Sequence, residues 1–146
     1  NKWRVLPCGN GSKLKWGGLA KGIDIVVSTQ RLNKIINHAV GDLTLTAESG
    51  VKLADIRANL AENNQIIALN PTAPEKATIG GIIATGDTGS LRQRYGSVRD
   101  QLLGITFVRA DGEIIYRFLR NFRYYYRSNF SAISHAVSFG NCDVNG

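Results

Sequence analysis

The sequence has few of the residues that build disulfide-bonded or metal-bound scaffolds. Its 146 residues include only two cysteines, Cys8 and Cys142, and two histidines. No cysteine or histidine pair has the spacing of a metal site, so we expect two unrelated thiols in a reducing compartment. No apolar run approaches the ~20 residues that a membrane-spanning helix needs, and no secretory signal is recognisable. The expected location is therefore the cytoplasm, without a membrane span.

The sequence also lacks a recognisable set of catalytic side chains. Neither His38 nor His135 has an obvious catalytic partner, and no Ser/His/Asp set or pair of acids can be argued. We therefore predict no catalytic residue and no metal ligand. If the protein is an enzyme, a cofactor carries the chemistry.

The composition is that of one globular domain with a basic excess. Hydrophobic residues make up 43% and charged residues 20%, and the net charge is +7. Residues 117–146 hold four arginines against one acid, and seven of the chain's 12 aromatic residues. Arginine interleaved with aromatics is typical of single-strand nucleic-acid binders. A polyanion or nucleic-acid binder is therefore one alternative, although the rest of the chain has no recognisable module for that function.

Two glycine-rich segments are the most informative feature that is present. The first is Cys-Gly-Asn-Gly-Ser-Lys at 8–13, and the second runs from Ala77 to Gly89. Glycine permits positive φ and close backbone approach, and successive inward N–H groups form an anion site. We predict that the amides near Asn10 and those near Ile79 converge on one diphosphate. The first segment is neither a dinucleotide-binding Rossmann turn, because Leu14 replaces the third glycine, nor a P-loop.

Periodicity predicts alternating strands and helices that end in a hairpin. Strands are expected at 3–7, 24–27, 43–46, 65–69 and 102–109, with a turn at 110–113 and a return strand at 114–116. Apolar residues at helical spacing predict a helix from Thr29 to Val40 that carries His38, and a second with Leu53, Ile56 and Leu60 on one face. A short helix is expected from Thr78 to Thr85. The alternation implies βαβ units, and the hairpin adds an antiparallel element.

Taken together, these segments resemble the FAD-binding domain of the vanillyl-alcohol-oxidase, or PCMH-type, flavoproteins. The most similar members are the FAD-binding E subunit of glycolate oxidase and other D-2-hydroxy-acid dehydrogenases. The resemblance covers most of residues 3–116. It is carried by LPCGNGSK at 6–13, DIVVS at 24–28, LTAESGV at 45–51, ATIGGIIAT at 77–85, RYGSVRD at 94–100 and VRADG at 108–112.

The resemblance implies an α+β fold, with a βαβ first subdomain and a remnant of a second, antiparallel subdomain. It implies non-covalent FAD, because no histidine stands at a position that matches the covalent attachment in some relatives. A first pyrophosphate loop would comprise Gly9, Asn10, Gly11, Ser12 and Lys13. The diphosphate and ribityl chain would lie along Thr78, Ile79, Gly80 and Gly81, and the rest of the groove would be lined by Thr85, Gly89, Tyr95 and Gly96.

The resemblance also implies a reaction and partners. The family's chemistry is hydride transfer to flavin from a 2-hydroxy acid such as glycolate. The substrate-side acid or base would come from another domain, and other oxidase subunits are expected partners. An inactive fragment of such an enzyme is the alternative, because loss of the second subdomain would leave part of the cofactor uncovered.

The sequence departs from the family at both ends. The family domain begins a strand and a helix before Asn1, so we expect residues 1–116 to be a partial PCMH-type domain. After the hairpin, a segment of the type G-S-x-G-T-x-G-I-I-T-x-V-T-F is expected, and residues 117–146 show nothing like it. Suitable synonymous codons for Arg117 to Phe130, read in a shifted frame, encode such a segment. We therefore hypothesise that residues 117–146 are an anomalous tail produced by a deletion and a frameshift after Tyr116.

Overall fold

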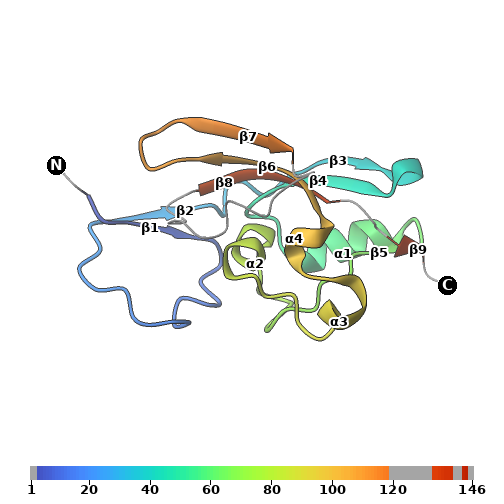
Figure 1. The fold of residues 1–146 in the computed structure, drawn as a ribbon, viewed down its shortest axis with the longest axis horizontal. Coiled ribbons are helices and arrows are strands. Elements are labelled where there is room, and N and C mark those ends of the chain that lie inside the picture. The colour runs from blue at the N-terminus through green and yellow to red at the C-terminus, as the bar shows by residue number, and fades with distance from the viewer. Residues whose placement is uncertain (1–2, 119–132, 140–142, 145–146) are drawn as a thin grey trace.

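The structure is a computed structural model that describes residues 3–118, 133–139 and 143–144. Figure 1 shows strands in one layer and helices in another. In chain order the elements are β1 (Val5–Cys8), β2 (Ile25–Ser28), β3 (Ile35–Ala39), the 3-10 turn η1 (Val40–Asp42), β4 (Thr44–Glu48), α1 (Leu53–Ala61), β5 (Gln65–Ile66), α2 (Ile79–Thr85), α3 (Arg92–Tyr95), α4 (Val98–Gln101), β6 (Leu102–Val108), β7 (Ile114–Phe118), β8 (Ile133–Phe139) and β9 (Asp143–Val144).

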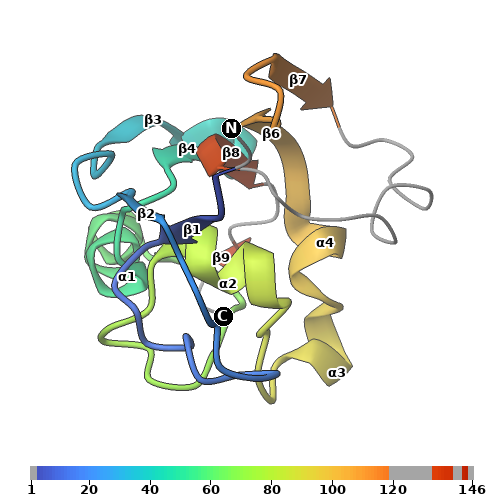
Figure 2. The same ribbon diagram turned by 90° about the vertical axis from the view of Figure 1, so that its left-hand side faces the viewer.

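The main sheet has five strands in the order β3-β4-β8-β6-β7, and every neighbouring pair is antiparallel. Strands β1 and β2 form a separate parallel pair, and β5 pairs with β9. The four helices lie on one side of the five-stranded sheet, as the two perpendicular views show (Figures 1 and 2). This mixture of sheets and helices confirms the predicted α+β class.

The core lies between the sheet and these helices. Its buried side chains come from strands β4 and β6, from helices α1, α2 and α4, and from the segments that connect these elements. They include Leu45 and Ala47 on β4, Ile105 on β6, Leu53, Ile56 and Leu60 on α1, Ile79 and Ile82 on α2, and Val98 on α4. Helix α2 is therefore fixed in the core by its isoleucines, and its glycine-containing start is held in one position.

Several elements form where the sequence predicts them. The helical spacing of Leu53, Ile56 and Leu60 marks α1, and all three side chains are fully buried. The hairpin of β6 and β7 turns at 110–113, where the Arg109 N–H donates to the Glu113 carbonyl and Gly112 has a φ of +88°. The strand expected at 65–69 is shorter, because only Gln65 and Ile66 pair as β5.

The helix expected from Thr29 to Val40 is wrong. Residues Ile35–Ala39 form β3, which pairs with β4 through an irregularity that leaves Ile36 without a partner. Residue 36 is 54% exposed, whereas a helix would have placed it on the apolar face. The chain just before β3 is bonded to the turn after β4, because the Gly50 N–H donates to the Leu32 carbonyl over 2.7 Å. Tertiary pairing overrides the helical spacing here.

Because this segment is a strand, His38 does not cap a helix. Its Nε2 lies 2.8 Å from Oε1 of the buried Gln65, and Gln65 donates in turn to the Val40 carbonyl over 2.9 Å. The imidazole thus links β3 to β5 and has a structural role.

The loop of residues 9–24 connects β1 to β2 and projects from the body of the molecule (Figure 1). It exposes Trp16 by 49% and Leu19 by 73%. The Arg- and Tyr-rich run that the sequence places after β7 falls within residues 119–132, outside the described residues. Cys142 also lies outside the described residues. The domain boundary at 116 and the frameshift stay predictions.

The start of α4 gives a testable pH dependence. The side chain of Asp100 reaches back over the first turn, and its Oδ2 accepts from the Ser97 N–H over 2.8 Å and from the Ser97 hydroxyl over 2.7 Å. These bonds lower the pKa of Asp100 from its ordinary value of 3.8, and the bond from the Ser97 side chain contributes most. A carboxyl whose pKa is lower in the folded state stabilises the fold above the unfolded pKa, and this contribution is lost as the pH falls through the folded value.

We therefore expect Asp100→Asn to lower the free energy of unfolding at pH 7 by at most about 1 kcal/mol, because the site is exposed. The difference from wild type should shrink as the pH falls below the ordinary pKa of 3.8 and should vanish as it falls through the lower pKa of folded Asp100. Urea unfolding at several pH values measures both. Asp42→Asn is the control, since its carboxylate accepts no hydrogen bond in the described part of the chain. A difference that does not change with pH would contradict the assignment.

Candidate functional site

The first glycine segment lies directly against the second. A Cβ at Gly9 would collide with Oγ1 of Thr78, so the Gly9 backbone lies closer to the Thr78 side chain than any side chain at residue 9 would permit. The Asn10 side chain adds a second link, since its Nδ2 donates to the Lys76 carbonyl over 3.0 Å. The predicted juxtaposition of the two segments is thus present, although they are far apart in the sequence.

The backbone of the first segment offers open donors. No hydrogen bond from the N–H groups of residues 9–13 is present in the part of the chain that the structure describes. Gly11 has a φ of +69°, which favours glycine at this position. Asn10, Gly11 and Ser12 are exposed to solvent. Consecutive amides that are accessible and unpaired form an anion-binding arrangement.

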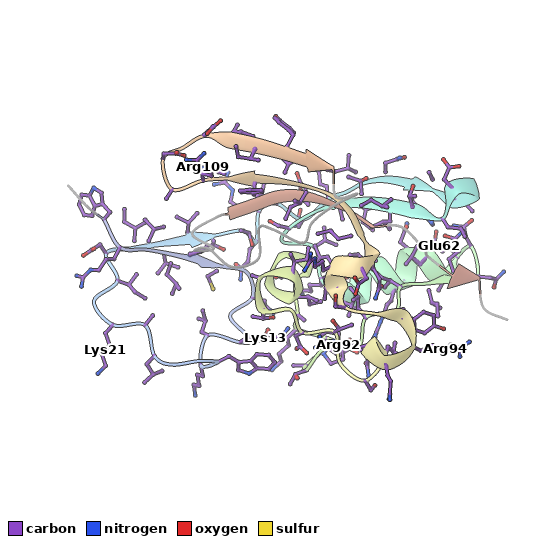
Figure 3. All side chains as sticks on the ribbon, in the orientation of Figure 1. Lys13, Lys21, Glu62, Arg92, Arg94 and Arg109 are labelled. Atoms are coloured by element: carbon purple, nitrogen blue, oxygen red, sulfur yellow. The ribbon has the colours of Figure 1, made fainter. Side chains whose placement is uncertain are left out.

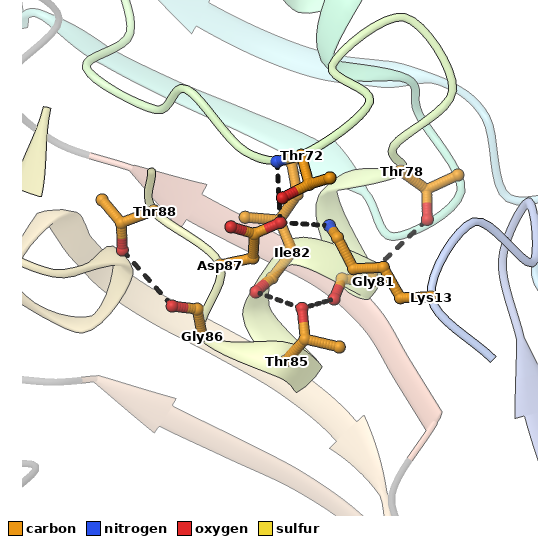
Figure 4. Close-up of polar contacts among 9 residues, drawn as sticks. All are labelled: Lys13, Thr72, Thr78, Gly81, Ile82, Thr85, Gly86, Asp87 and Thr88. Carbon is orange, nitrogen blue, oxygen red and sulfur yellow. Dashed lines mark hydrogen bonds and ion pairs between the residues drawn. The ribbon is translucent and has the colours of Figure 1, made fainter. Parts of the chain in front are cut away.

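The amides of the second segment are already used. The Ile79 N–H donates to the Val51 carbonyl over 2.9 Å, and the Gly80 N–H to the Ser49 carbonyl over 2.8 Å. The Gly81 N–H donates to Oγ1 of Thr78, which is the N-cap of α2 (Figure 4). These amides are therefore not open donors in this structure, and their predicted convergence on a diphosphate stays a prediction. Thr78 to Gly81 form a wall beside the open loop.

Lys13 brings a positive charge from the loop to Asp87, which follows the C-terminal end of α2. Its Nζ lies 3.1 Å from Oδ2 of Asp87, and only 7% of the Lys13 side chain and 9% of the Asp87 side chain are exposed (Figure 4). The Trp16 ring lies 5.7 Å from the same nitrogen. Nζ makes no hydrogen bond within the described residues, so the contact with Asp87 is an ion pair alone. A buried ammonium with unused donors is costly without a further acceptor.

The remaining predicted residues lie farther along the same stretch of chain. Thr85 ends α2, and its hydroxyl donates to the Gly81 carbonyl over 2.8 Å. Gly89 has a φ of +74° and packs against the backbone of Asn70. Tyr95 ends α3, and Gly96 follows it with a φ of +83° beside Asp100. No hydrogen bond or ion pair in the described part of the chain joins these four residues to residues 9–13.

Two residues of the site have no counterpart among the predicted ones. Asp87 lies within the second segment, but nothing in the local pattern indicates that it faces Lys13. Thr72 contributes its N–H, which donates to Oδ2 of Asp87 over 2.9 Å. Both interactions depend on how distant segments meet, which periodicity does not report. Among the described residues, no group of three His, Cys, Asp or Glu side chains is arranged to hold a metal ion, and no helix has the length and apolar character to cross a membrane.

These features together fit a diphosphate-containing ligand. The open amides supply hydrogen-bond donors, the close contact between Gly9 and Thr78 fixes the loop, and the buried ammonium has donors to spare. Amides and a lysine are the groups that commonly cradle phosphate oxygens in proteins.

Comparisons with known proteins identify the family of this chain. The model of the family described as FAD binding domain matches residues 1–116. D-2-hydroxyglutarate dehydrogenase from Xanthomonas citri pv. viticola is 32% identical over 111 residues, which are 76% of this chain and 24% of that protein. D-lactate dehydrogenase from Anaerostipes hadrus is 31% identical over 115 residues, or 79% of this chain and 24% of that protein. The chain thus spans about a quarter of the length of these relatives.

Solved structures show the same fold. A structure of alkyldihydroxyacetonephosphate synthase matches with a TM-score of 0.74 at 18% sequence identity, covering 94% of this chain and 28% of that one. At this level of identity the match concerns the fold alone. It confirms the PCMH-type architecture that the sequence predicts.

The contact between Gly9 and Thr78 gives a second prediction. Gly9→Ala should lower the free energy of unfolding by about 1–3 kcal/mol, because the added methyl group overlaps the Thr78 side chain and the loop must move. Chemical denaturation measures this change. Gly41→Ala is the matched control, since a Cβ there meets nothing within 4 Å, and its effect should stay within about 0.5 kcal/mol. Equal effects of the two substitutions would show that the loop does not depend on this contact.

Proposed function

This chain belongs to the FAD binding domain family, and on that premise we propose that residues 9–13 bind the diphosphate of non-covalent FAD. FAD is the cofactor of this domain. The open amides of Gly9, Asn10, Gly11 and Ser12 would contact the phosphate oxygens, together with the Lys13 ammonium. The observation that supports this assignment most is that these N–H groups donate to no described residue, while Asn10, Gly11 and Ser12 are exposed beside the start of α2.

The wall formed by Thr78 to Gly81, and the segments that follow α2, would extend the site. Thr78, Ile79, Gly80 and Gly81 would lie along the diphosphate and ribityl chain through van der Waals contact. Thr85, Gly89, Tyr95 and Gly96 would line the rest of the groove. We propose non-covalent attachment because no histidine stands at a position in the sequence that matches the covalent attachment of some relatives, and His38 is bonded to Gln65.

We propose that the protein serves as the cofactor domain of a larger flavin-dependent oxidoreductase that acts on a 2-hydroxy acid such as glycolate. When bound, FAD supplies an acceptor for the hydride of an alcohol carbon. The residues of this chain would bind and orient the cofactor and balance the charge of its diphosphate. The names of the relatives, D-2-hydroxyglutarate dehydrogenase and D-lactate dehydrogenase, support a 2-hydroxy acid as substrate. The acid or base that handles the substrate would come from another part of the enzyme or from a partner subunit.

The proposed diphosphate loop is tested with ADP, which carries the diphosphate but lacks the flavin. Isothermal titration of the 146-residue chain should show saturable binding, and Gly11→Ala should weaken it about tenfold or more. Alanine is strained at a φ of +69°, so the loop would turn amides away from the anion.

Gly112→Ala is the matched control for this experiment. Gly112 also has a positive φ, +88°, and a Cβ there meets nothing within 4 Å, but it lies in the turn between β6 and β7. Its substitution should leave ADP affinity unchanged. A folded wild-type chain that binds neither ADP nor FAD would contradict the proposal and favour the inactive fragment.

A further inference from the structure

The partner of Lys13 is fixed independently of the diphosphate loop. Asp87 follows Gly86, the left-handed residue that ends α2, and the Asp87 N–H donates to the Ile82 carbonyl over 3.2 Å. The Thr72 N–H donates to its Oδ2 over 2.9 Å. Figure 4 shows Asp87 with both of these partners, Thr72 and Ile82, beside it. The carboxylate is thus held by the end of a core helix and by a neighbouring loop before any ligand binds.

The position of Lys13 differs from that of the other lysines in the same loop. Figure 3 shows Lys21 at the outer edge of the projecting loop, whereas Lys13 lies where the loop meets the body. Lys15 and Lys21 are exposed, but the Lys13 side chain is only 7% exposed. A long, flexible side chain is buried with its charge only when a partner holds it there.

The charges of Lys13 and Asp87 neutralise each other, but the N–H donors of the Lys13 ammonium lack acceptors among the described residues. Asp87 neutralises the ammonium across 3.1 Å, and yet Nζ donates no hydrogen bond within the described residues. An ammonium carries several N–H donors, so it can contact an anion without leaving Asp87. A carboxylate without its lysine would instead repel an incoming phosphate at short range.

We propose that Asp87 is a positioning residue that holds the Lys13 ammonium at the diphosphate loop and depends on Lys13 to offset its own charge. This inference rests on the proposed function, and it assigns to Asp87 a role that the loop amides do not have. The consequence is that removing the carboxylate has opposite effects on anion binding when Lys13 is present and when it is absent.

ADP titration of four proteins tests the reversal: wild type, Lys13→Met, Asp87→Asn and the double variant. Lys13→Met should weaken ADP binding about 30-fold, because the ammonium is lost and the Asp87 charge is left unpaired. Asp87→Asn should weaken it about threefold when Lys13 is present, since the ammonium is no longer held. In the Lys13→Met background the same change should strengthen binding about threefold. Effects of equal sign in the two backgrounds would overturn the proposal.

Acetylation of lysines reports the positioning without any ligand. With limiting N-hydroxysuccinimidyl acetate and peptide mapping, Lys13 of the wild type should react at least about tenfold more slowly than Lys15 and Lys21. Asp87→Asn should remove most of that protection, while the reactivity of Lys15 and Lys21 stays unchanged. Protection of Lys13 that persists in a folded Asp87→Asn variant would show that Asp87 does not hold it.

The two measurements separate the possible failures. A wild-type chain that fails to bind ADP contradicts the proposed function, whatever the acetylation pattern shows. If Asp87→Asn does not fold, as circular dichroism would show, Lys13→Met and the double variant still carry the test, because the double variant buries no charge at this site. Equal ADP affinity of these two proteins would then overturn the inference.

Discussion

The close contact of Gly9 with Thr78 is the constraint on which the rest of the site depends. It brings the loop after β1 against the start of α2, and α2 is itself anchored in the core through Ile79 and Ile82. A residue with a side chain at position 9 would separate the two segments. Without that approach, Asn10 would not reach the Lys76 carbonyl. The geometry of the loop is therefore set by packing, and its open amides follow from that geometry.

The two glycine segments have different roles despite their similar composition. In the first, the backbone N–H groups remain without partners in the described structure. In the second, the backbone is bonded to the turn at Ser49 and Val51, and Gly80 allows it to approach Ser49 closely. Glycine in one case exposes donors and in the other permits tight packing. Composition alone does not distinguish these uses, because the difference lies in which acceptors are nearby.

Much of the fold could be predicted from the sequence, and the failures have physical causes. The core helices were recognisable because their apolar spacing coincides with real burial, as for Leu53 and Leu60 in α1. The same spacing at Ile35 and Ile36 is misleading, since pairing with β4 determines the structure there. The glycine loop was recognisable from its residues. The pairing of Lys13 with Asp87 was not, because it depends on how two distant segments meet.

The central claim is that the amides of residues 9–13, and not those of the second segment, bind a diphosphate. Titration of the ¹⁵N-labelled chain with ADP, followed by amide chemical shifts, tests it most directly. The account predicts that the N–H signals of residues 9–13 shift most and saturate together, while those of Ile79 and Gly80, already bonded to the 49–51 turn, shift less because they lie beside the diphosphate without donating to it. Saturable binding with the largest shifts at Ile79 and Gly80, and none at residues 9–13, would contradict it.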